Sequence, residues 1–134
     1  MARPGGSWRC WEARRPSRPE WAARGPGGPL TLIDANILLL AVDEASPFHR
    51  VAGRWLEDRL NGPRRVGLPW QSLGAFLRIS AHPRAAEHPL STDEAWSYVE
   101  DWLTAEVVWI PQPTERHAEV LGSVVTAYQL RGNR

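Results

Sequence analysis

The sequence contains no lysine, a single cysteine (Cys10) and no long apolar run. A single cysteine excludes an intrachain disulfide and a cysteine-rich zinc site. The apolar stretches are far shorter than the roughly 18 to 20 residues that a membrane-spanning helix needs, and the N-terminus lacks the apolar core of a signal peptide. We therefore expect a cytoplasmic protein without structural disulfides.

All 16 basic residues are arginine, and they are unevenly distributed. Residues 1–29 hold six arginines and two glutamates, whereas residues 30–134 hold ten arginines and 13 acidic residues. A basic segment beside a mildly acidic domain is one pattern of a nucleic-acid-binding arm. The same segment is rich in glycine and proline and has no apolar periodicity, so we predict that it is disordered. A vestigial or mis-assigned extension fits this composition better than an RNA-binding arm.

Residues 30–134 alternate between strand and helix signals. The β-branched run at 30–33 predicts a buried strand, and Asn36 can cap the short apolar helix that follows it. Ser46 followed by Pro47 predicts the start of a second helix. The later elements are expected, in chain order, as a strand at 65–68, a helix from Pro69 to His82, a helix capped by Ser91 and Glu94, a strand at 106–110 and a helix capped by Thr114.

Strands that alternate with helices predict an α/β domain with a parallel sheet. Asp34 directly follows the first predicted strand. In open α/β sheets, ligands bind at the carboxyl ends of the strands, so Asp34 is a candidate functional carboxylate. An aspartate after a strand is also a common helix cap. The position alone leaves both roles open.

The residues Leu-Ile-Asp-Ala-Asn at 32–36 resemble the first-strand motif of PIN domains. In that motif the aspartate, here Asp34, is a catalytic metal ligand, and the residue two positions later, here Asn36, supports it. Other stretches are similar, in the same order, to one VapC-type subfamily: 41–49, 68–70, 76–79, 82–84, 89–91 and 113–117. On these motifs, residues 30–134 are identified as a partial member of the PIN-domain family, of the VapC type.

The resemblance implies a three-layer αβα fold with a central parallel sheet, of which this chain holds about three strands. It also implies an endoribonuclease toxin whose acidic residues bind Mg²⁺ or Mn²⁺ at the edge of the sheet. Such a metal polarises the scissile phosphate and lowers the pKa of an attacking water. The implied partners are an RNA substrate, a cognate antitoxin and a second subunit in a homodimer.

The sequence departs from the family pattern at two places. The second acid of the family lies on the helix after the second strand, where this chain has Ala75 or, in an alternative placement, Gln71. Glutamine offers a neutral oxygen in place of a charge. The third and fourth acids follow a segment that corresponds to Gly132 and Asn133, and the sequence ends at Arg134. These departures predict a C-terminally truncated chain with impaired catalysis.

Three functions are therefore considered. The first is a metal-dependent endoribonuclease, in which Asp43 and Glu44 are weak candidates for compensating acids near the sheet edge. The second is an inactive remnant that binds an antitoxin or a partner subunit. The third is another α/β protein with a strand-end aspartate, such as a receiver domain or an aspartyl phosphatase. The third is disfavoured because Asn36 replaces the second acid of such phosphatases and because the lysine of receiver domains is absent.

Removing residues 1–29 is expected to leave both the melting temperature and the RNA affinity unchanged, because a segment of this composition buries too little surface to stabilise the domain. Thermal unfolding and RNA-binding titrations of the two forms test this. A large fall in RNA affinity would identify the segment as a nucleic-acid arm instead.

Overall fold

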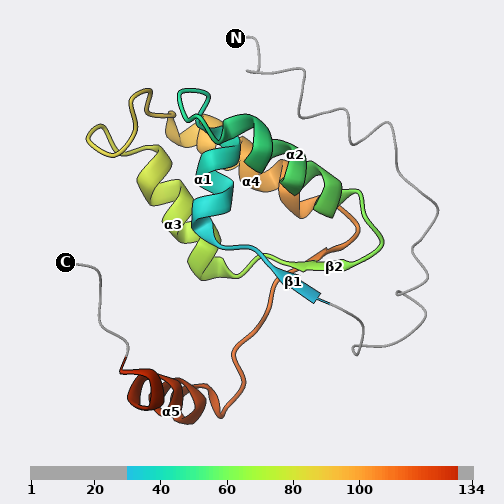
Figure 1. The fold of residues 1–134 in the computed structure, drawn as a ribbon, viewed down its shortest axis with the longest axis vertical. Coiled ribbons are helices and arrows are strands. Elements are labelled where there is room, and N and C mark those ends of the chain that lie inside the picture. The colour runs from blue at the N-terminus through green and yellow to red at the C-terminus, as the bar shows by residue number, and fades with distance from the viewer. Residues whose placement is uncertain (1–29, 130–134) are drawn as a thin grey trace.

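The computed structural model describes residues 30–129, and the prediction for residues 1–29 lies outside this range (Figure 1). The predicted α/β class is confirmed, since strands and helices alternate and all strand pairs are parallel. The elements in chain order are β1 (Leu30–Leu32), α1 (Ala35–Val42), α2 (His49–Leu60), β2 (Arg65–Gly67), α3 (Trp70–Ser80), α4 (Thr92–Leu103), β3 (Val108–Trp109) and α5 (His117–Tyr128).

The strand order β1-β2-β3 follows the order of the chain. Crossovers between parallel strands are right-handed, so two successive steps in the same direction place their helices on the same face of the sheet. Figure 1 shows this arrangement, with α1 to α4 gathered on one side of the strands. No helix among residues 30–129 is long and apolar enough to cross a membrane.

The core lies between this helical layer and the covered face of the sheet. Ile33, Val66 and Leu68 contribute buried side chains from the strands and their ends, and Leu38 and Leu56 contribute them from α1 and α2. Apolar burial of this kind supplies most of the free energy that favours folding.

Three aromatic side chains join α3 to α4 in this core. The ring centroids of Phe76 and Trp102 are 4.9 Å apart with an interplanar angle of 65°, and those of Phe76 and Tyr98 are 6.4 Å apart at 82°. Edge-to-face pairs of this kind add to the free energy of area burial. Phe76 and Trp102 are almost completely inaccessible to solvent. The aromatic cluster therefore fixes the contact between the two helices.

None of the helices α1 to α4 covers the opposite face of the sheet. The register aligns Leu32 with Gly67 and Gly67 with Trp109, so these residues share that face. Leu32 is 59% exposed. A Cβ atom on Gly67 would lie 2.5 Å from Cδ2 of Leu32, so a larger residue at this position would require the Leu32 side chain to move. Arg65 covers part of this face, with its guanidinium carbon 4.6 Å from the centre of the Trp109 ring.

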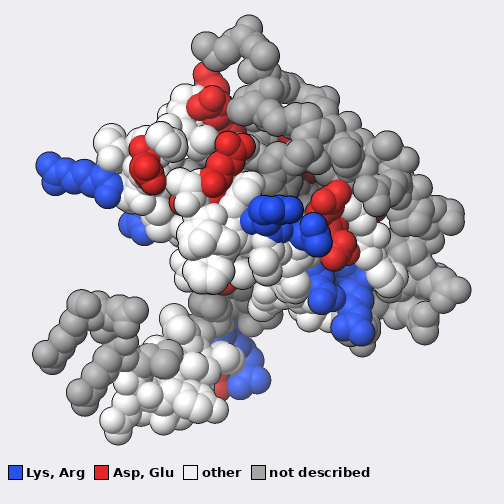
Figure 2. Space-filling model, turned by 45° about the horizontal axis from the view of Figure 1, so that its top comes forward, with Lys and Arg blue, Asp and Glu red and all other residues white. Residues whose placement is uncertain are grey.

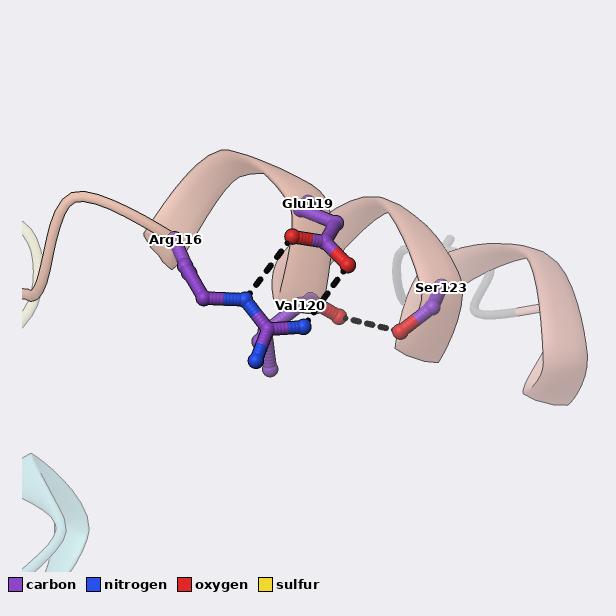
Figure 3. Close-up of polar contacts among 4 residues, drawn as sticks. All are labelled: Arg116, Glu119, Val120 and Ser123. Atoms are coloured by element: carbon purple, nitrogen blue, oxygen red, sulfur yellow. Dashed lines mark hydrogen bonds and ion pairs between the residues drawn. The ribbon is translucent and has the colours of Figure 1, made fainter.

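Helix α5 lies apart from the other elements (Figure 1). It has no buried residue, although Val120, Leu121 and Val125 are apolar. Figure 3 shows its stabilising polar contacts: Arg116 donates from Nε and from a terminal nitrogen to the Glu119 carboxylate, at 3.0 and 2.8 Å. This pairing lowers the pKa of the Glu119 carboxyl. The helix is thus held by local contacts, not by packing on the core.

The predicted helix caps were right in one case and wrong in three. Ser91 and Glu94 form the predicted capping box, with each side chain bound to the backbone N–H of the other. Asn36 does not cap α1, because Asp34 does so two residues earlier. Ser46 and Thr114 lie before turns that precede α2 and α5, and no side chain caps either helix.

Replacing Phe76 by alanine is expected to lower the free energy of unfolding by about 3–5 kcal/mol, because it removes the buried ring between α3 and α4 and leaves a cavity. Urea unfolding measures the change. Phe48→Ala is the matched control, since Phe48 is 62% exposed and should change stability by less than about 0.5 kcal/mol. Equal losses in the two variants would contradict the packing described here.

Candidate functional site

Asp34 lies at the carboxyl edge of the sheet, directly after β1. The backbone N–H of Ile33 donates to the carbonyl of Gly67 at 3.0 Å, which holds the end of β1 against β2. β2 ends at Gly67 at the same edge, and Pro69 is the N-cap of α3. The N-terminal ends of α1 and α3 therefore both follow strands at this edge, where helix dipoles favour negative charge.

The Asp34 side chain is exposed, and its Oδ2 accepts a hydrogen bond from the backbone N–H of Asn36 at 3.3 Å. This contact makes Asp34 the N-cap of α1. Asn36 is the second residue of the helix and is also exposed. Asp34 therefore caps α1, and its carboxylate remains exposed to solvent, where it can bind a ligand.

Gln71 and Ala75 lie on α3 after the end of β2. Gln71 is exposed and lines a shallow hollow of about 390 Å³ together with Ser72, Gln112 and His117. Asp34 does not line this hollow. Ala75 is half-buried in the next turn of the helix and carries no polar group. Neither residue supplies a second carboxylate beside Asp34.

Asp43 and Glu44 lie at the other end of α1 from Asp34. Helix α1 has eight residues, and at a rise of 1.5 Å per residue it separates its two caps by roughly 12 Å. Asp43 caps the C-terminus of α1, and its Oδ1 accepts from the N–H of Ala45 at 3.1 Å. The hypothesis that these acids approach the carboxyl edge of the sheet does not agree with this placement.

A divalent metal at Asp34 would need further oxygen ligands. Mg²⁺ takes six ligands in near-octahedral geometry, and a hard dication prefers several anionic oxygens. Among residues 30–129, no three histidine, cysteine, aspartate or glutamate side chains come together as a possible metal site. The described residues therefore offer one anionic ligand and do not by themselves fit a resident dication.

One feature of the structure was not indicated by the sequence. A second cavity lies at the C-terminal ends of α1 and α3, and Ser80, Glu44 and Glu94 are among the residues that line it. The sequence offers no signal for it, because these residues are far apart along the chain and follow no known motif. Helix packing alone brings them together.

The chain is similar to several mycobacterial proteins over most of its length, and no protein-family model matches it. It is 38% identical over 97 residues to Ribonuclease VapC37 of Mycobacterium tuberculosis, a match that covers 72% of this chain and 67% of the relative. It is 39% identical over 87 residues to Ribonuclease VapC33 of the same species, covering 65% of this chain and 61% of the relative. Ribonuclease VapC43 is 28% identical over 101 residues, which are 75% of this chain and 69% of that relative. The chain thus spans about two thirds of the length of these relatives.

Replacing Asp34 by alanine is expected to lower the free energy of unfolding by about 1 kcal/mol, because the first turn of α1 loses its cap. Asp34→Asn should cost far less, since asparagine caps helices about as well as aspartate. Urea unfolding of both variants tests this. If the asparagine variant were as unstable as the alanine variant, the carboxylate charge and not the cap would be stabilising the helix.

Proposed function

Because the chain belongs to the VapC family of PIN-domain ribonucleases, we propose that it derives from a toxin that hydrolyses RNA phosphodiesters with Mg²⁺ or Mn²⁺. In this proposal Asp34 is the metal ligand, and Asn36 supports the first turn of α1 behind it. A cognate antitoxin and a second subunit are the proposed protein partners.

The position of Asp34 is the observation that carries this proposal. It is an exposed carboxylate that follows β1 at the carboxyl edge of the sheet and caps the N-terminus of α1, and α3 begins at the same edge. That edge is where α/β proteins bind ligands, and the partial positive charge of helix N-termini favours anionic groups such as phosphate. A carboxylate beside two such termini suits a metal that bridges protein and phosphate.

We further propose that the 134-residue chain is a poor catalyst. Gln71 and Ala75 bring no negative charge to the site, and Asp43 lies at the far end of α1. A single carboxylate leaves most of the charge of a dication unmatched, so the metal would bind weakly. The described residues do not complete a metal site.

The second candidate function is binding without catalysis, as an inactive member of the family. It is favoured by two sets of exposed apolar side chains: Leu30 and Leu32 on β1, and the apolar residues of α5. Exposed apolar surfaces of this kind are common at protein–protein contacts. Either an antitoxin or a second subunit could use them without any contribution from Asp34.

Purified full-length chain is expected to cleave RNA slowly, and only with Mg²⁺ or Mn²⁺, whereas Asp34→Asn should reduce the remaining rate by about 100-fold or more. Even an outer-shell partner of a metal ligand typically contributes 10–100-fold, and the asparagine variant keeps the helix cap. Single-turnover cleavage of a labelled RNA pool, with and without chelator, measures the rates.

Asp43→Asn is the matched control, because it removes an exposed carboxylate from the other end of the same helix. It should leave the rate unchanged. If metal-dependent cleavage survived in the Asp34→Asn variant, Asp34 would not be part of the metal site. Absence of cleavage in every form, together with binding of a partner protein, would establish the second candidate function.

A further inference from the structure

A cavity of about 340 Å³ lies between α1, α3, α4 and the loop that joins α3 to α4. It is at the C-terminal ends of α1 and α3, whereas Asp34 is at the N-terminal end of α1. Its volume is at the lower limit of the 300–1,000 Å³ that small-molecule sites usually have. The cavity is therefore a site separate from the carboxyl edge of the sheet.

The floor of the cavity is apolar. Leu39 contributes from α1, Phe76 and Ile79 from α3, Leu90 from the loop and Tyr98 from α4. Phe76 is fully buried, Leu39, Leu90 and Tyr98 are partly buried against the core, and Ile79 is half-buried. An apolar group that entered here would replace water against these side chains, which is favourable at roughly 25 cal/mol for each Å² of apolar surface buried.

The rim of the cavity is negative. Asp43 and Glu44 line it at the end of α1, and Glu94 lines it from the first turn of α4. The C-terminus of α1 adds the negative end of its dipole, and its last turn holds no basic residue. Figure 2, which brings this end of the molecule toward the viewer, shows several acidic side chains gathered in the upper part of the view.

The acidic side chains also act on Tyr98, which lines the cavity. The pKa of the Tyr98 hydroxyl is raised, first by its burial and then by the charges of Glu44, Glu94 and Asp101. Glu44 lies in the turn after α1 and Glu94 in the first turn of α4, and both residues line the cavity. A positive charge placed there would be attracted by both.

One polar group inside the cavity lacks a partner. Ser80 is the last residue of α3 and is 6% exposed, and its Oγ makes no hydrogen bond to any described residue. A buried hydroxyl without a partner typically costs about 1–3 kcal/mol. A ligand that supplied a donor to this oxygen would remove that cost.

We propose that this cavity binds a small amphipathic cation, in which an apolar group occupies the floor and an ammonium group lies between the acidic rim and Ser80. The ammonium donates hydrogen bonds to the Ser80 hydroxyl and to the carboxylates of Glu44 and Glu94. The only basic side chain among the described residues of the lining is His88, and no arginine is present there. The inference is independent of the proposed ribonuclease activity.

Phenethylamine is the probe, because it joins an aromatic ring to a primary ammonium. Titration of the full chain, followed by amide chemical-shift changes, should give saturable binding with a Kd of about 1 mM, as expected for a ligand of this size. The shifts should cluster at the ends of α1 and α3 and the start of α4. 2-Phenylethanol has nearly the same shape without the charge and should bind about 10-fold more weakly.

Two variants test the residues. Exposed ion pairs contribute modestly, so Glu44→Gln should weaken phenethylamine binding by about 2–5-fold, and Ser80→Ala should weaken it by about 2–10-fold. Neither change should affect the binding of 2-phenylethanol by more than a small factor. Glu115→Gln is the matched control, since Glu115 is exposed and does not line the cavity.

A lysine side chain of another protein offers the same ammonium on an apolar stem. A parallel titration with Nα-acetyl-lysine methylamide distinguishes a lysine side chain from a free amine. Tighter binding of the blocked lysine supports a protein side chain as the natural occupant. Tighter binding of phenethylamine supports a free amine. Equal affinities for phenethylamine and 2-phenylethanol, shifts that map elsewhere, or no saturable binding would each overturn the proposal.

Discussion

The handedness of the strand connections is the constraint on which the rest of the structure depends. Because β1, β2 and β3 lie in chain order, right-handed crossovers place α1 to α4 on a single face of the sheet. All of the well-packed core is therefore on that side. The same constraint places none of these four helices on the other face of the sheet.

The direction of the helices then separates two kinds of surface. Each helix that directly follows a strand begins at the carboxyl edge of the sheet and ends at the opposite side of the domain. The beginnings of α1 and α3 place helix N-termini at the edge where Asp34 lies, which favours anionic groups. The ends of the same helices bring Glu44 and the Ser80 hydroxyl together, which favours a cation. One helical layer thus presents opposite electrostatic character at its two ends.

The sequence predicted the elements well, because each signal was local. The strand at 30–33, the capping box of Ser91 and Glu94, and the strand-end position of Asp34 all depend on neighbours along the chain. The predicted caps at Ser46 and Thr114 were wrong. The Ser46 hydroxyl and the Thr114 carbonyl each accept a hydrogen bond within a turn that precedes the helix. The cavity at Ser80 could not be predicted, since it arises where three helices fail to fill the space between them.

The length and exposure of α5 determine how stable it is as a helix. Isolated helices shorter than about 12–15 residues are only marginally formed in water, and α5 has 12 residues and buries none of them. The Arg116–Glu119 pair contributes only a small part of the free energy that a lone helix lacks. The helicity of residues 117–128 is therefore coupled to burial, so the exchange of their amide hydrogens reports directly on whether another surface covers Leu121 and Val125.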